Sequence, residues 1–383
     1  MISSEPLLHV GIIERARLIS GRFQGCFETK QVKQVRGIFS AENRNNRINV
    51  TLGGEIINFD TDHVLFKGDE STTFIIDDVL IGRKFHWERK ENQEFCGNLI
   101  LYPDIKGTVT VINQVPLEEY IRSVISSEMS ATAPEELLKA HAITSRSWLA
   151  AMLEQKGNTR QKTSIEKQID GVEEIIRWYG REDHRLFDVC NDDHCQRYHG
   201  ITRIVSENVQ KSIEETEGKF LVSEDSICDA RFSKSCGGIT ELYSNTWEDK
   251  DVCYLSSVQD LKNSDYSINT ESEARNWILS KPDAYCNTSD VNVLQTILPD
   301  FDRETADFFR WAVSYKREEL EKLLYKKSGY DFRELRAIEP LERGPSGRIT
   351  RLKIIGTKRT VIVGKELEIR RWLAPSHLYS SAF

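Results

Sequence analysis

The chain of 383 residues carries 52 basic and 60 acidic side chains, a formal net charge of −8 at pH 7. Hydrophobic residues make up 39% and charged residues 29%, which is typical of a globular protein and excludes a disordered one. The acidic balance argues against a nucleic-acid-binding protein, which usually carries a basic excess or a basic stripe. No apolar run reaches the roughly 18 residues of a transmembrane helix, and no signal peptide is visible at the amino end.

The first part of the chain, residues 7 to 112, is predicted to be rich in β-strands. Short apolar runs such as Phe74-Ile75-Ile76 are separated there by Gly, Asn and Asp turn signals. From Pro116 to Glu128 the apolar residues recur with the 3.6-residue period of a helix. A second helix is predicted from about Pro134 to Glu154, because Pro is favoured in a first helical turn.

The rest of the chain alternates between helical and strand-rich patterns. Residues 155 to 185 are polar, and we expect an inserted amphipathic helix because their apolar residues have helical spacing: Ile165, Ile169, Val172 and Ile176. Short strands are predicted from 186 to 260, helices from 270 to 337, and strands with one short helix from 347 to 383. The expected fold class is therefore α+β, with a β-rich core, a two-helix segment, an inserted helical region and a C-terminal strand-rich tail.

The segment from Val111 to Met129 is the most informative about function. On a helix, one stripe facing the core contains Leu117, Ile121, Val124 and Glu128. A carboxyl group at the end of an apolar stripe is partly desolvated, which raises its pKa and suits a general acid near neutral pH. The alternative is that Glu128 ends the helix and projects into water.

The second predicted helix places His141, Ser145 and Arg146 where they could line a groove beside Glu128. A histidine or serine on such a face is also a common hydrogen-bonded packing residue. His141 and Ser145 are one helical turn apart, so a Ser/His nucleophile pair is conceivable, but no glycine motif of an oxyanion hole accompanies them. An acyl hydrolase therefore has little support.

Two cysteines and two histidines lie within twelve residues, and this set consists of His184, Cys190, His194 and Cys195. Two nitrogen and two sulfur ligands suit tetrahedral zinc, and four protein ligands would leave no position for water, so the metal would be structural. Buried free cysteines are the alternative. The other six cysteines allow many disulfide pairings, among which the sequence does not choose.

A further candidate is the pair Gly237-Gly238, which follows Lys234. Paired glycines adopt backbone conformations closed to other residues and let a ligand approach the main chain. Lys234, Gly237 and Gly238 could therefore form one wall of a saccharide groove. The alternative is a simple Gly-Gly turn between two strands.

Together these segments resemble the SpoIID/LytB family. The resemblance covers residues from about 108 to 250 and from 340 to 383. It rests on the stretches Asn113–Tyr120, Ser127-Glu128-Met129, Leu138–Trp148, Asp188-Val189-Cys190, His194–Gly200, Thr216-Glu217-Gly218, Cys236-Gly237-Gly238 up to Trp247, and Ser346–Phe383. The sequence departs from the family where His141 replaces a glutamine, where Ser147-Trp148 replaces Thr-Tyr, and in the long insertion at 155 to 185.

The resemblance implies a lytic transglycosylase with Glu128 as its catalytic residue. Such enzymes cleave the β-1,4 bond between N-acetylmuramic acid and N-acetylglucosamine in peptidoglycan without water and leave a 1,6-anhydro product. One carboxyl group suffices, whereas a hydrolase ordinarily needs a second carboxylate, and none stands out here. A non-catalytic wall-binding enhancer of a cell-wall amidase is the main alternative, and a zinc-dependent hydrolase is a third.

The resemblance also assigns the remaining roles. It implies a location in the cell envelope, glycan strands as the partner, and a zinc ion held by the Cys/His set. Substrate contacts are expected from Tyr120, His141, Ser145, Arg146, Lys234, Gly237 and Gly238. The expected regions are 1–107 as a β-rich beginning, 108–260 as the SpoIID-like core with the insertion 155–185, 261–340 as a helical region, and 341–383 as closing β elements of that core.

Overall fold

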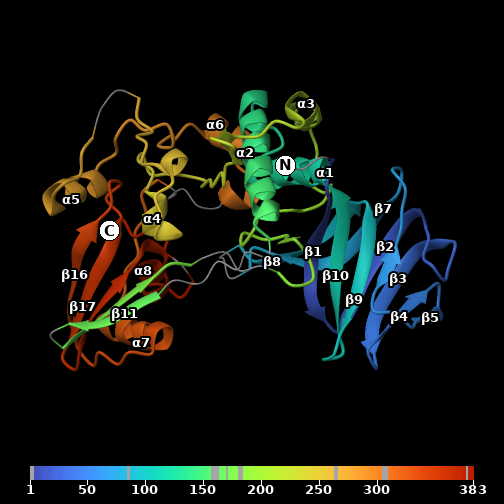
Figure 1. Cartoon of the computed structure of the whole chain (residues 1–383), viewed down its shortest axis with the longest axis horizontal. Helices are drawn as coiled ribbons and strands as arrows, with labels where there is room; N and C mark the ends of the chain where they lie inside the picture. Colours follow the sequence, from blue (N-terminus) through green and yellow to red (C-terminus); the bar gives the residue numbers. More distant parts are fainter. Residues whose placement is uncertain are drawn as a thin grey trace. The chain divides into compact units, whose positions relative to one another are not determined.

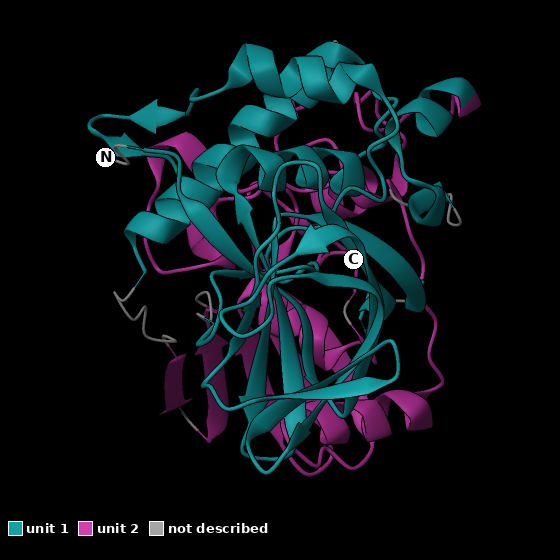
Figure 2. Cartoon of the chain, turned by 90° about the vertical axis from the view of Figure 1, so that its right-hand side faces the viewer, with its two compact units in different colours: residues 1–156, 183–230, 292–303 teal, residues 157–182, 231–291, 304–383 magenta. Residues whose placement is uncertain are grey.

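The computed structural model describes residues 4–83, 87–156, 164–169, 171–179, 184–262, 266–303, 309–376 and 378–383. The chain folds into two compact units, which Figure 2 shows in different colours. Unit 1 comprises residues 1–156, 183–230 and 292–303, and unit 2 comprises residues 157–182, 231–291 and 304–383. The chain therefore passes between the units several times, which differs from the contiguous regions expected from the sequence.

Unit 1 is β-rich, as predicted for residues 7 to 112. Its described residues form a five-stranded sheet in the order β13-β1-β10-β9-β6 and a six-stranded sheet in the order β5-β4-β3-β2-β7-β8. Most of these strands are labelled in Figure 1, and their bounds are β1 (Leu7–Ala16), β2 (Leu18–Phe27), β3 (Val35–Arg44), β4 (Arg47–Leu52), β5 (Glu55–Phe59), β6 (Val64–Phe66), β7 (Thr73–Ile81), β8 (Arg89–Cys96), β9 (Asn98–Asp104), β10 (Thr108–Pro116) and β13 (Val189–Cys190). Both sheets contribute buried side chains to one hydrophobic core.

The first helix of unit 1 follows directly from β10, and the others come later in the chain. The helices are α1 (Leu117–Glu128), α2 (Glu135–Glu154), α3 (Glu207–Thr216) and α6 (Val291–Ile297), with a 3-10 turn η2 (Asp300–Arg303) and a small hairpin of β14 (Val222–Ser223) and β15 (Ser226–Ile227). The predicted apolar stripe of α1 is confirmed, because Leu117, Ile121 and Val124 are at most 3% exposed. The sequence did not predict α3, whose N-cap Ser206 accepts a hydrogen bond from the Asn208 N–H.

Unit 2 is built on a five-stranded sheet in the order β11-β12-β18-β17-β16. Its elements are β11 (Ser164–Ile169), β12 (Val172–Arg177), α4 (Tyr243–Thr246), η1 (Cys253–Leu255), α5 (Glu271–Leu279), α7 (Arg317–Ser328), β16 (Leu335–Arg343), β17 (Ile349–Gly356), β18 (Thr360–Gly364) and α8 (Glu366–Trp372). The strands and short helix predicted for the tail from 347 to 383 are confirmed. No helix in the described ranges of the chain is both long and apolar enough to cross a membrane.

The inserted helix predicted for residues 155 to 185 is wrong. The described part of the insertion is a hairpin of β11 and β12, and β12 pairs in parallel with β18. The apolar spacing fits both structures, because residues four positions apart in sequence lie on one face of a strand as well as on one face of a helix. The Asp-Gly sequence at 170–171, a strong hairpin signal, should have decided the choice, and Gly171 has a positive φ of 79°. Residues 157–163, 170 and 180–183 of the insertion lie outside the described ranges.

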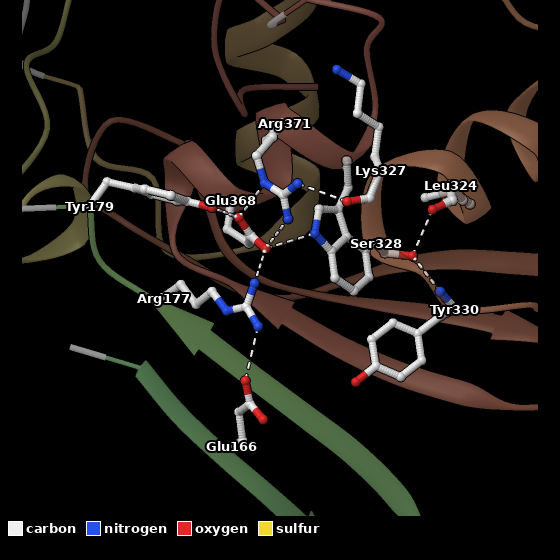
Figure 3. A network of polar contacts seen from close by, with 10 residues as sticks. Glu166, Arg177, Tyr179, Leu324, Lys327, Ser328, Tyr330, Glu368 and Arg371 are labelled. Carbon is white, nitrogen blue, oxygen red and sulfur yellow. Dashed lines mark hydrogen bonds and ion pairs between the residues drawn. The ribbon is translucent and has the colours of Figure 1, made fainter. Parts of the chain in front are cut away.

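A buried carboxylate on α8 ties this hairpin to the end of the chain (Figure 3). The Glu368 side chain is fully buried and accepts hydrogen bonds from Arg371, Tyr179 and the Trp372 indole. Arg177 of β12 lies 3.4 Å from the same carboxylate. Burial raises the pKa of Glu368, but the hydrogen bonds from Arg371 and Tyr179 outweigh it and lower the pKa overall. Insertion and tail are thus joined within unit 2.

Candidate active site and Cys/His cluster

Glu128 is the last residue of α1, at the point where the buried stripe of this helix ends. Its side chain is only 13% exposed. The backbone N–H of Arg197 donates a hydrogen bond of 3.0 Å to Oε1, and the Nε of Arg197 lies 3.8 Å from Oε2. Glu128 therefore does not project freely into water, and its carboxyl group has a defined orientation.

Arg197, which the sequence motifs did not single out, is the centre of a charged group around Glu128. Its guanidinium donates to Asp193 at 2.7 Å and to Asp302 at 2.9 Å, and it lies over the ring of Trp87 at 4.7 Å. Burial alone lowers the pKa of Arg197, but the charges of Asp193, Glu128 and Asp302 outweigh it and raise the pKa. The closer ion pairs are those with the two aspartates, so the positive charge beside Glu128 is already largely compensated.

The segment that presents Arg197 is held against α1 and β10. Tyr198 stacks on Tyr120 with ring centroids 5.1 Å apart, and its hydroxyl donates to the Asn113 side chain. The His199 N–H donates to the Ser123 hydroxyl at 3.2 Å. These contacts fix the backbone on the carboxyl side of Arg197, and with it the N–H that binds Glu128.

The four predicted zinc ligands lie together in unit 1. Their ligand atoms are all within 4.8 Å of one another. His184 Nε2 is 3.4 Å from Cys195 Sγ, and His194 Nδ1 is 3.5 Å from Cys195 Sγ and 4.0 Å from Cys190 Sγ. In a tetrahedral zinc site the bonds are about 2.3 Å to sulfur and about 2.0 Å to nitrogen, so a sulfur ligand and a nitrogen ligand lie about 3.5 Å apart. The spacing of the donors therefore fits a zinc ion.

The contacts within the cluster also favour the thiolate form of one of its cysteines. A hydrogen bond from Cys195, followed by contacts with His184 and His194, lowers the pKa of Cys190 below its ordinary value. A thiolate is the form of cysteine that binds metal. Cys190 ends β13, which is paired with β1, so this sulfur is anchored to the sheet.

The Cys/His cluster and Glu128 are linked through a short stretch of chain. Cys195 ends a turn in which its N–H donates to the Asp192 carbonyl at 3.0 Å. Arg197, which orients Glu128, follows two residues later. A group bound at the cluster would therefore restrain the chain two residues before Arg197.

Several residues that are expected to contact substrate are buried. Tyr120, Ser145 and Arg146 are each 0% exposed, so their side chains are surrounded by protein in this structure. Arg146 instead donates to both carboxylate oxygens of Glu118, at 2.8 and 2.7 Å. His141 is buried as well. The helical period identified the face of α2 correctly, but that face packs into the core of unit 1 instead of lining a groove.

Lys234, Gly237 and Gly238 belong to unit 2, whereas Glu128 belongs to unit 1. The predicted unusual backbone is present, since φ is 73° at Gly237 and 100° at Gly238. Gly238 packs so closely on Trp277 that a Cβ atom there would lie 3.0 Å from the ring. Gly237 instead lines a pocket of unit 2. The close approach at Gly238 therefore contributes to packing against Trp277.

Comparisons with known proteins find similarity to a described family in the segment that carries the site. Residues 105–222 match the model of the stage II sporulation protein family, and residues 241–383 match a domain family of unknown function. The chain is 28% identical over 149 residues to stage II sporulation protein D of Bacillus amyloliquefaciens, and 24% identical over 155 residues to that of Bacillus subtilis. Each match covers 39% of both chains.

A third relative is an uncharacterised protein of Brachyspira hyodysenteriae, 25% identical over 154 residues, or 40% of this chain and 34% of the relative. The chain thus spans well under half of the length of the curated relatives it matches. The matched segment contains both Glu128 and the Cys/His cluster. Residues 105–222, which carry the candidate site, are thus similar to the stage II sporulation protein D (SpoIID) family.

Proposed function

We propose that the protein is a lytic transglycosylase that cleaves peptidoglycan glycan strands, with Glu128 as the single general acid and base. The observation that carries this proposal is the shielded carboxyl group at the end of α1, held by the Arg197 N–H. The match of residues 105–222 to the SpoIID family supports a role at the cell wall and an extracytoplasmic location.

The proposed reaction needs one carboxyl group in two protonation states. Protonated Glu128 donates its proton to the glycosidic oxygen as the bond from this oxygen to C1 of the muramoyl residue breaks. The carboxylate then takes the proton of the muramoyl 6-hydroxyl as that oxygen attacks C1, which forms the 1,6-anhydro ring and restores the acid. No water is consumed. A net cation close by would oppose the protonated state, and the pairing of Arg197 with Asp193 and Asp302 reduces this effect.

A zinc ion, if bound, would be held by His184, Cys190, His194 and Cys195. Four protein ligands close its coordination shell, so the ion would supply structure and no reactive water. In this proposal the cluster holds the turn before Arg197, and Arg197 orients Glu128. A zinc-dependent hydrolase has correspondingly less support.

Digestion of purified peptidoglycan, with mass spectrometry of the products, tests the proposal. Wild type should release 1,6-anhydro muropeptides, and Glu128→Gln should lower the rate by about 10³-fold, as expected for a lost general acid. The amide oxygen of glutamine can still accept the Arg197 N–H, so the fold should remain. Glu119→Gln, on the same helix and paired with Arg122 at 2.9 Å, is the matched control and should keep most of the activity.

Two outcomes would overturn the proposal. If wild type releases no anhydro product from intact or denuded strands while an active control enzyme does, the protein is not a transglycosylase. Retention on insoluble peptidoglycan by both wild type and Glu128→Gln would then favour the amidase-modulating alternative. Products with a free reducing end would instead indicate a hydrolase.

A further inference from the structure

A second group of metal-binding side chains lies in unit 2, and the proposed function does not use it. It consists of Cys236, Asp260 and Cys286, whose ligand atoms all lie within 4.8 Å of one another. The two sulfur atoms are 3.7 Å apart, and Cys236 Sγ is 3.6 Å from Asp260 Oδ2. All three side chains are half-buried.

These separations decide between a disulfide and a metal site. A disulfide needs its sulfur atoms about 2.05 Å apart. A tetrahedral zinc ion with bonds of about 2.3 Å to sulfur and about 2.1 Å to oxygen requires about 3.8 Å between two sulfurs and about 3.6 Å between sulfur and oxygen. The observed distances match the second pattern. We propose that Cys236, Asp260 and Cys286 bind a second zinc ion.

The backbone around the cluster is arranged so that three distant segments each present one ligand. The Asp260 N–H donates to the Gly238 carbonyl at 2.8 Å, and the Tyr285 N–H donates to the Asp260 carbonyl at 3.1 Å. Isolated β-bridges pair Ile239 with Gln259 and Leu261 with Ala284. The ligands are therefore held in place by main-chain hydrogen bonds before any metal binds.

The turn at Cys236 carries a further feature of metal–thiolate sites. The Gly238 N–H donates to Cys236 Sγ at 3.3 Å, and hydrogen bonds to ligating sulfur are part of the outer shell that tunes such sites. This geometry needs the left-handed conformations of Gly237 and Gly238, with φ of 73° and 100°. The Gly-Gly pair expected to form a saccharide groove thus has a specific alternative role, which is to aim an N–H at a metal ligand.

Nearby charges favour the ligand set. Two thiolates and a carboxylate carry three negative charges, of which a zinc ion compensates only two. Arg348 donates to the Cys236 carbonyl at 3.0 Å, and Arg310 donates to the Gly237 carbonyl at 3.3 Å. Both guanidinium groups therefore lie beside the turn and offset the remaining charge.

The number of protein ligands predicts that one coordination position of the zinc ion is open to an exchangeable ligand. Among the described residues this cluster supplies three ligands, and a tetrahedral zinc ion takes a fourth, such as water. Cys236 also lines a partly open pocket together with Arg310 and Arg348. Solvent or a small ligand can thus approach this sulfur. The second site differs in this respect from the Cys/His cluster, whose four protein ligands close the shell.

Metal analysis of the full chain tests the inference in a background that lacks the Cys/His cluster, Cys190→Ser with Cys195→Ser. This double variant, loaded with zinc and gel-filtered, should keep about one zinc ion per chain. Adding Cys236→Ser or Asp260→Asn should remove it, while Cys253→Ser, at an exposed cysteine of unit 2, should not. Cobalt loading should give sulfur-to-cobalt charge-transfer absorption that disappears with Cys236→Ser.

Asp260→Asn keeps both thiols, so its effect separates a metal site from a disulfide. If peptide mapping without reductant finds Cys236 joined to Cys286, or if the zinc content is unchanged by both Cys236→Ser and Asp260→Asn, the inference is wrong. Circular dichroism identifies a variant that fails to fold. In that case the test is made on the folded double variant, Cys190→Ser with Cys195→Ser, from which a chelator must release the zinc ion. None of these readouts depends on glycan cleavage, so they remain valid if the proposed enzyme activity fails.

Discussion

The two cysteine-containing clusters differ in how the chain brings their ligands together. The cluster of unit 1 is drawn from residues 184 to 195 and lies two residues before Arg197. In the cluster of unit 2, Cys236 is separated from Asp260 by 24 positions and from Cys286 by 50. A link that closes a longer loop removes more freedom from the unfolded chain. The comparison suggests that the first cluster mainly orients Glu128, while the second mainly stabilises its unit.

The largest expected effect is a loss of activity when the cluster of unit 1 is removed, and it tests whether this cluster orients Glu128. Replacing Cys190 and Cys195 by serine should lower the rate of anhydro-product formation by about 100-fold, although Glu128 is unchanged, because the turn before Arg197 loses its support. Initial rates and zinc content should be measured together. Cys26→Ser, at a half-buried cysteine of β2, is the control. Full activity in a metal-free double variant would show that the cluster does not position Glu128.

The next largest effect concerns the stability of unit 2 and a contact that involves none of its cysteines. Glu368→Ala should lower the free energy of unfolding by about 3 kcal/mol, because it removes a fully buried carboxylate and leaves the half-buried Arg371 and Tyr179 groups without this partner. Glu339→Ala, which breaks an exposed ion pair with Lys353, should cost less than about 1 kcal/mol. Urea titrations provide both values. Equal losses in the two variants would contradict the role assigned to Glu368.

A pH experiment sharpens the description of the segment that carries Arg197. Burial, followed by the charges of Arg203 and Arg197, lowers the pKa of His199 from its ordinary 6.5 to about 3. Below pH 6.5 the unfolded chain binds a proton that the folded chain does not, so stability falls with falling pH until about pH 3. Between pH 7 and pH 5 the expected loss is about 2 kcal/mol.

His199→Gln is the comparison for this titration, because glutamine does not ionise. The difference in unfolding free energy between wild type and variant should change by about 2 kcal/mol between the two pH values, in favour of the variant at pH 5. A difference independent of pH would mean that His199 has the same pKa in the folded and unfolded chains, and that its pKa is not lowered by folding.

The smallest expected effects compare one helix N-cap in each unit. Thr270→Ala should remove the capping box that Thr270 forms with Glu273 at the start of α5, at a cost of about 1 kcal/mol. Ser206→Ala removes a single cap bond at the start of α3 and should cost no more than that. Thermal unfolding of both variants measures the difference. A larger loss from Ser206→Ala would show that this serine does more than cap its helix.

Local patterns were sufficient for one part of the site and misleading for another. The period of α1 placed Glu128 at the end of a buried stripe, and the structure confirms that geometry. The same period on α2 led to an expected groove at Ser145 and Arg146, which are buried. Periodicity identifies the face that leaves water, but it does not distinguish a face covered by core from a face covered by substrate.

The sequence alone determined the strand-rich beginning, the two helices α1 and α2, and the Cys/His cluster, because each depends on residues close together in the chain. Tertiary structure alone revealed the pairing of Arg197 with Asp302, the contact of β12 with β18, and the cluster of Cys236, Asp260 and Cys286. These contacts join residues far apart in sequence. Their partners are selected by how whole segments pack, and no local spacing encodes that choice.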